Sequence, residues 1–180
     1  MLKSEDLDTY RKMKLWINEM PDSVDNTVTY KADEYKASKN IHWFHGELCL
    51  ELRIAPRAAS NYAMLNLKFT GYQSSKFQVV YKVCNADEIV KSDIAMPNDT
   101  VKTGIVKEYY KTLQQVFDEM SLQYVFPSGT LEIIGGRYGV IGSSAVAVKV
   151  VLKILLKLFE LDEHFKTSDI NSIILKGCKE

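Results

Sequence analysis

Residues 131–159, LEIIGGRYGVIGSSAVAVKVVLKILLKLF, carry the strongest structural pattern in the chain. Leu131–Ile134 is a short apolar run typical of a strand, and the glycines of Gly135–Gly142 predict a loop. Ser143 or Ser144 then caps a helix, because a serine hydroxyl accepts a hydrogen bond from the free N–H groups of a helix start. The segment is therefore predicted as a strand, a loop and a helix.

The predicted helix is apolar at a period of 3.6 residues from Ala145 to Phe159. Its basic residues fall at successive i, i+4 steps and therefore share one face. They are Lys149, Lys153 and Lys157.

Upstream, apolar and polar residues alternate, which is the pattern of half-buried strands. Strands are predicted over residues 48–54, 64–69 and 77–83, after a short strand at Val28–Lys31. Short loops join the three longer strands, which favours an antiparallel meander. A helix begins near Val106. This order of elements predicts an α+β two-layer sandwich with helices on one face of the sheet.

The two ends of the chain are predicted as helical additions to this domain. Apolar residues from Leu7 to Met20 recur at helical spacing, which predicts an N-terminal helical arm over residues 1–25. The main domain then covers residues 26–160. Residues 161–180 contain a C-terminal short helix that begins near Ser168 and ends at Gly177.

The chain has 180 residues, with 23 basic and 23 acidic side chains and no formal net charge. A hydrophobic share of 46% excludes a disordered polymer. Zero net charge argues against indiscriminate nucleic-acid binding, but residues 52–86 and 135–159 hold basic side chains and no acidic one. The charged N-terminus lacks the apolar stretch of a signal peptide, and three scattered cysteines favour a reducing compartment. We therefore expect a cytoplasmic protein with no membrane partner.

Motifs for catalysis, metal binding or cofactor binding are not evident. His42 and His45 are three residues apart, but they lead into a strand, where that spacing places them on opposite faces. The chain lacks both the Gly-x-Ser-x-Gly elbow and the Walker A pattern. We therefore expect no catalytic residue, no metal and no cofactor.

The loop Gly135–Ser144 has two interpretations. Its glycines fit a strand-to-helix turn, whereas a ligand loop would offer the N–H groups of the helix start and the Arg137 guanidinium to a phosphate. Ile141–Ala145 also resembles the Gly-Ser-Ser-Ala phosphate loop of small-molecule kinases of the galactokinase and homoserine kinase type. A small phosphate-ligand enzyme that uses this turn is one alternative function.

The same loop more closely resembles the fourth domain of elongation factor G, which also occurs in the ribosomal-protection proteins that confer tetracycline resistance. That domain typically reads Asp-Gly-Ser-Tyr-His-x-Val-Asp-Ser-Ser-Glu-x-Ala-Phe-Lys. The chain keeps this register at several positions, namely Gly136, Tyr138, Ser143, Ser144, Ala147 and Lys149. Further similar segments occur in the family order at residues 28–31, 62–69, 76–79 and 106–109.

The resemblance implies a four-stranded sheet covered by two helices, with a left-handed βαβ crossover. It also implies a stand-alone, non-enzymatic domain without a GTPase that binds the ribosome or a structured RNA in a translation-related role. Two loops, Ala55–Asn61 and Gly135–Gly142, correspond to the tip that enters the decoding site in the elongation factor. The tip histidine of the family falls at Gly139 in this chain.

The residues expected to contact RNA are the basic side chains of these segments, the polar tip residues and two tyrosines for base stacking. They are Arg53, Arg57, Asn61, Tyr62, Lys68, Lys76, Arg137, Tyr138, Ser143, Ser144, Lys149, Lys153 and Lys157.

The main alternative is a protein-interaction module that keeps the fold and has lost the ribosomal tip chemistry. In this interpretation the N-terminal helix docks a protein partner or a second copy of the chain. Trp16, Trp43 and Phe44, expected to be exposed, favour it because aromatic residues are enriched at interfaces.

Overall fold

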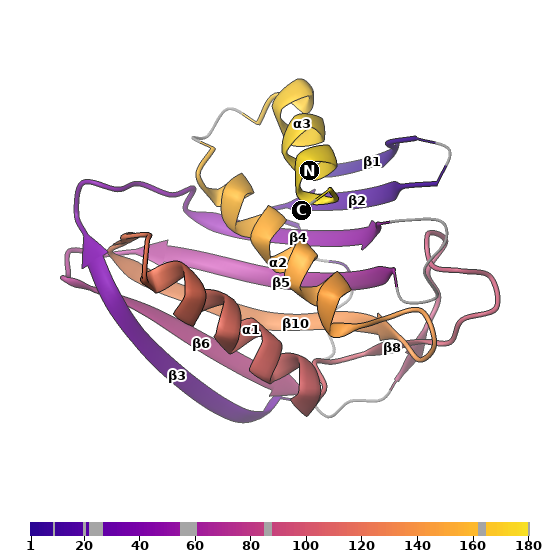
Figure 1. Cartoon of the computed structure of the whole chain (residues 1–180), viewed down its shortest axis with the longest axis horizontal. Coiled ribbons are helices and arrows are strands. Elements are labelled where there is room, and N and C mark those ends of the chain that lie inside the picture. Colours follow the sequence, from indigo (N-terminus) through magenta and orange to yellow (C-terminus); the bar gives the residue numbers. More distant parts are fainter. Residues whose placement is uncertain are drawn as a thin grey trace.

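One large mixed β-sheet carries all the helices of the described chain on one face (Figure 1). The computed structural model describes residues 1–8, 10–19, 21, 27–54, 61–84, 88–161 and 165–179. Its strands are β1 (Leu2–Asp6), β2 (Lys12–Ile17), β3 (Thr27–Ser38), β4 (Gly46–Arg53), β5 (Tyr62–Gly71), β6 (Lys76–Cys84), β7 (Ile89–Val90), β8 (Val101–Thr103), β9 (Phe126–Pro127) and β10 (Gly129–Gly139). Its helices are α1 (Lys107–Ser121), α2 (Ala145–Phe159) and α3 (Thr167–Gly177). The predicted α+β class is confirmed, but a sheet of four strands is wrong, because the described residues form a sheet of ten.

The sheet has the strand order β1-β2-β4-β5-β10-β6-β3-β9, with β7 and β8 attached beside β10. The predicted meander is therefore only partly correct. β4 and β5 are antiparallel neighbours, but β10 lies between β5 and β6, antiparallel to the first and parallel to the second. The short loop between β5 and β6 predicted that these two strands are neighbours. The structure instead has β10, a strand from much later in the chain, between them.

The predicted N-terminal helix is wrong, because this region forms the antiparallel pair β1 and β2. Met13, Leu15 and Ile17 are buried, while the lysines between them are partly exposed. A period of two residues thus places one face of β2 on the core, although the apolar residues also match a helical spacing. Since β2 pairs with β4, the sheet continues across the predicted boundary at residue 25.

The helices and one face of the sheet enclose the main hydrophobic core. The three helices confirm those predicted near residues 106–120, 145–159 and 168–177. Trp43 is only 4% exposed, so the expectation of an exposed Trp43 is wrong. Its ring is stacked 5.8 Å from that of Phe159 and meets Phe77 edge-on at 5.5 Å, and such aromatic pairs stabilise a core beyond their buried area.

The glycines at the end of β10 lie in the strand rather than in a loop. A Cβ atom at Gly136 would lie 2.5 Å from the carbonyl oxygen of Met64 on β5, so only glycine fits at this close approach. The predicted loop therefore shrinks to the few residues between Gly139 and Ala145.

None of the helices in the described residues is long and apolar enough to cross a membrane.

Candidate functional site

The turn between β10 and α2 is held to the start of β5 by Ser143. The Ser143 hydroxyl donates to the Tyr62 carbonyl oxygen at 2.5 Å and accepts from the Gly139 amide at 2.7 Å. The Tyr62 amide in turn donates to the Gly142 carbonyl oxygen at 2.7 Å. The structure therefore brings together two of the predicted site residues, Tyr62 and Ser143, which are distant in sequence.

Asp99, which precedes β8, fills the centre of this turn. Its carboxylate accepts from the amides of Ile141 and Gly142 at 3.0 and 2.8 Å. A Cβ atom at Gly139, which aligns with the histidine of the domain that this loop resembles, would lie 1.8 Å from one Asp99 oxygen. Asp99 was not predicted as a site residue, because it is far from the turn along the chain and belongs to no motif.

Four of the N–H groups around this turn are therefore already bonded, namely those of Gly139, Ile141, Gly142 and Ala147. Asp99 supplies a negative charge where an anion would bind, and Ser144 caps α2 by accepting from the Ala147 amide at 3.2 Å. The predicted serine cap is confirmed. The turn geometry supports the interpretation of a strand-to-helix connection over that of a phosphate loop.

Tyr62 and Asn61 are 0% and 3% exposed, so neither side chain is available to RNA at the surface. The Tyr62 hydroxyl donates to a carboxylate oxygen of Glu51 at 2.6 Å. Burial, and then the charge of Glu51, raise the pKa of Tyr62 far above its ordinary value. The ring of Tyr62 is therefore not at the surface, where the predicted base stacking would take place.

The predicted basic residues of the sheet are engaged with neighbouring groups. Arg53 donates to the Tyr10 carbonyl oxygen at 2.9 Å, Lys68 lies 3.3 Å from Glu47, and Lys76 lies 2.6 Å from Glu34. Arg137 is paired in register with Met64 on the sheet face away from the helices, because Leu65, the next residue along β5, faces the main core. Arg57 lies outside the described residues.

Tyr138, the second predicted stacking residue, is half-buried against α1. Its ring centroid is 6.1 Å from that of Tyr109 in an edge-on arrangement. Tyr138 and Arg137 are consecutive in a strand, so they point to opposite faces of the sheet. The predicted RNA contacts are thus divided between the two faces and do not form one surface.

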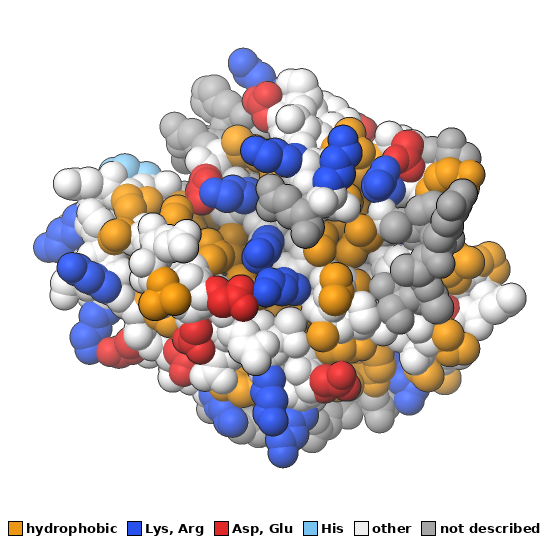
Figure 2. Space-filling model, in the orientation of Figure 1, with side chains coloured by type: hydrophobic (Ala, Val, Ile, Leu, Met, Phe, Trp, Pro, Cys, Tyr) orange, Lys and Arg blue, Asp and Glu red, His pale blue; other side chains and the backbone are white. Residues whose placement is uncertain are grey.

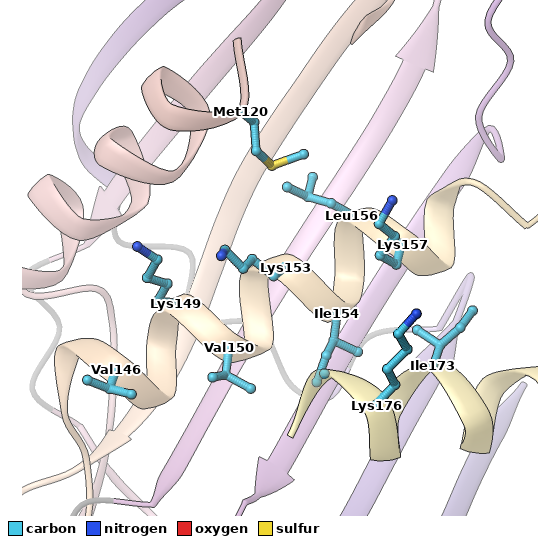
Figure 3. A pocket seen from close by; sticks show the side chains of 11 residues that line it. Met120, Val146, Lys149, Val150, Lys153, Ile154, Leu156, Lys157, Ile173 and Lys176 are labelled. Carbon is cyan, nitrogen blue, oxygen red and sulfur yellow. The ribbon is translucent and has the colours of Figure 1, made fainter. Parts of the chain in front are cut away.

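The helical face, defined here as the outer surface of α2 with the adjoining parts of α1 and α3, has a different character. Figure 2 shows basic and hydrophobic side chains together over this face. A groove of about 490 Å³ crosses it. Its lining residues are Met120, Val146, Lys149, Val150, Lys153, Ile154, Leu156, Lys157, Ile173, Lys176 and Gly177 (Figure 3).

The groove carries more positive than negative charge. Lys149 lies 2.9 Å from Glu119 and Lys157 lies 3.0 Å from Glu160. The hydrogen bond from Lys149 lowers the pKa of Glu119. Within the described residues, the ammonium groups of Lys153 and Lys176 form no hydrogen bond or ion pair. The lysine stripe was predicted, but the groove beside it was not.

Other reactive groups of the described chain do not assemble into a site. No three His, Cys, Asp or Glu side chains of the described residues gather as metal ligands. His45 meets the ring of Phe69 edge-on at 5.5 Å. Cys49 and Cys178 are free thiols, and burial raises the pKa of Cys178 to about 11, which disfavours a reactive thiolate.

Comparison with known proteins finds no matching family model, no matching curated protein and no matching solved structure. The geometry described above therefore carries the functional argument.

Proposed function

We propose that this chain is a non-enzymatic protein-interaction module whose binding surface is the helical face. The observation that carries this proposal is the open groove on α2, where apolar side chains lie beside lysines. Val146 is 70% exposed in this groove, next to the lysine stripe. A contiguous apolar surface with a polar rim is typical of a protein-binding site.

The turn between β10 and α2 supports the same proposal. Asp99 and Ser143 accept from the amides of Ile141, Gly142 and Gly139, which leaves fewer amides for a nucleotide or phosphate, and Tyr62 is buried. The tip chemistry of the elongation-factor domain is replaced by internal hydrogen bonds. The binding surface is therefore sought on the helices and not on the tip.

Site-resolved cross-linking tests this function. A photoreactive amino acid replaces Val146 on the helical face, and in a second protein it replaces Gln73, which is exposed in the turn between β5 and β6. We expect protein adducts from position 146 in cells, resistant to ribonuclease and weakened when Lys149, Lys153 and Lys157 are changed to Glu. Equal adducts from both positions, or adducts that ribonuclease removes, contradict the proposal.

Binding of the ribosome or a structured RNA is the second candidate, supported by the connection between β6 and β10. In Figure 1, α1 crosses in front of the sheet between these parallel strands. When the view is turned so that both strands point upward, β10 lies to the left of β6, which is the left-handed arrangement that the resemblance implies. The hydrogen bond from the Ser143 hydroxyl to the Tyr62 carbonyl oxygen joins the two residues that directly follow the two predicted tip loops in the sequence.

Sedimentation with ribosomes tests the second candidate. Binding through phosphate contacts is strongest at low salt, because bound cations are released from the nucleic acid. The chain is expected in the ribosomal fraction at low salt and in the supernatant at high salt. Its absence from that fraction at low salt excludes this candidate and leaves the protein-interaction module unaffected.

A further inference from the structure

α2 is more apolar than a surface helix should be. Its sequence, AVAVKVVLKILLKLF, has only three polar side chains, all lysine. A helix that is apolar on nearly every side is normally covered on every side. The sheet, α1 and α3 cover most of α2, but Val146 and part of Val150 remain open to solvent. The outer surface of α2 is therefore a face without a partner in the described chain.

The open surface of α2 consists of two parallel stripes. Val146 and Val150 are one i, i+4 step apart and the next step is the buried Ile154, and the three lysines follow the same spacing. Figure 3 shows Val146 and Val150 on one side of α2, and Lys149 and Lys153 on the side toward α1. Successive members of a stripe are about 6 Å apart along the helix, from a rise of about 1.5 Å per residue.

α3 forms the wall of the groove beside the apolar stripe. A Cβ atom at Gly177 would lie 2.4 Å from a side-chain carbon of Ile154, so glycine allows the end of α3 to approach α2 closely. Ile173 and Lys176 then line the groove from α3. The groove thus offers apolar contact at Val146, Val150 and Ile173, and ammonium groups on both sides.

We propose that this groove binds an amphipathic α-helix of a partner protein, in which a stripe of Asp or Glu side chains lies beside a stripe of apolar ones. The proposal rests on the proposed function and names the chemistry of the partner. Acidic side chains at i, i+4 spacing match the lysine stripe, and an apolar stripe covers Val146 and Val150.

The backbone of the partner also favours a helix over a strand. The backbone N–H and C=O groups in the middle of α2 are bonded within the helix, so the groove offers no ladder for an extended peptide. A helix satisfies its own backbone and presents only side chains. RNA is disfavoured because an exposed valine stripe gives nothing to a phosphate backbone.

A designed peptide is the probe. It has about 18 residues, since shorter isolated helices are marginal, with Leu and Glu stripes at helical spacing. Fluorescence anisotropy with a labelled peptide is expected to show binding that weakens as salt is raised. Changing Lys149, Lys153 and Lys157 to Glu is expected to weaken it about tenfold or more.

Matched controls separate this site from general attraction. A second protein carries the same three charge reversals at Lys36, Lys91 and Lys111, which are exposed and outside the groove. A second peptide has Gln in place of every Glu. The first control is expected to bind the acidic peptide as the unchanged protein does, and the second is expected to bind weakly. Restored binding of a Lys-striped peptide to the groove variant would further support direct contact.

Three results would overturn the inference. The first is that the acidic peptide does not bind, and the second is that both sets of charge reversals weaken peptide binding equally. The third is that an RNA with the same number of negative charges as the peptide displaces the peptide. If the peptide fails while charge-dependent protein cross-links from position 146 persist, the acidic helix is wrong and the protein-interaction module stands. If both fail, both proposals are wrong.

Discussion

The Asp99 carboxylate occupies the space that a side chain at Gly139 would need, and it also accepts two hydrogen bonds from the turn. A double-mutant cycle can measure the coupling energy between positions 99 and 139. Asp99→Ala removes the acceptor of the Ile141 and Gly142 amides. Gly139→Ala places a methyl group 1.8 Å from the same carboxylate, which must then leave its position. Both substitutions therefore break the same two hydrogen bonds by different routes.

The expected cost follows from those bonds. A hydrogen bond to a charged group contributes about 1.5–3 kcal/mol, and partial exposure of Asp99 lowers the total, so each single variant is expected to lose about 2–3 kcal/mol of unfolding free energy. Once Asp99 is Ala, the methyl group at position 139 meets no carboxylate. The double variant is therefore expected to lose no more than either single one, with a coupling energy of about 2 kcal/mol.

Urea unfolding followed by the fluorescence of the two tryptophans, Trp16 and the buried Trp43, measures the unfolding free energy of all four proteins. Gly139 has an ordinary backbone conformation, since it is not among the glycines with positive φ, so backbone strain does not confuse the comparison. Additivity of the two costs to within about 0.5 kcal/mol would refute the reasoning, because it would mean that the methyl group and the carboxylate do not compete.

Three further predictions concern the fold. Tyr62→Phe leaves the Glu51 carboxylate buried without its donor and is expected to cost about 1.5–3 kcal/mol in urea unfolding; an unchanged midpoint would show that this bond is not stabilising. Leu15→Ala in β2 is expected to cost about 2–5 kcal/mol, as in a core, and a loss below about 0.5 kcal/mol, the usual range for a surface substitution, would mean that the N-terminal strands are peripheral. Stability is expected to be level up to about pH 9 and to fall as the pH rises toward 12. Burial raises the pKa of Cys178 to about 11 and that of Tyr124 to about 12, so unfolding releases their protons in this range. Replacing Cys178 by Ala and Tyr124 by Phe should reduce the fall in thermal unfolding temperature as the pH rises. If the unfolding temperature falls with pH as steeply as before, other groups cause the loss of stability.

The spacing of apolar and polar residues was enough to predict an element wherever that element buries one side and exposes the other. The helix over residues 145–159 was predicted because its apolar residues recur at helical spacing, and the last helix because Ser168 and Gly177 mark its ends. The N-terminal pair failed because short segments with several apolar residues satisfy both periods, and only pairing with β4 resolves the ambiguity. Which strand lies beside β5 is a long-range property that no local pattern contains.

The candidate site was predictable only in part for the same reason. The lysine stripe is periodic within one helix, so the sequence shows it directly. The groove requires Met120 and Ile173 from other helices, and the closure of the turn requires Asp99 from a distant segment. Tyr62 looked like a tip residue because a loop precedes it, yet the segment with Ile94 and Val101 covers its ring.

The place of β10 in the sheet has a consequence for the order in which the protein forms during synthesis. The strands of the pairs β4–β5 and β3–β6 all precede Gly129–Gly139 in the chain, so these pairs can form before β10 has been made. Each of these half-sheets then has an open edge, and unpaired edges promote wrong association between chains. The two halves join only when the last third of the chain supplies the strand between them. Chains that stop before β10 are therefore expected to accumulate as aggregates, whereas chains that extend through α2 complete the sheet and its cover together.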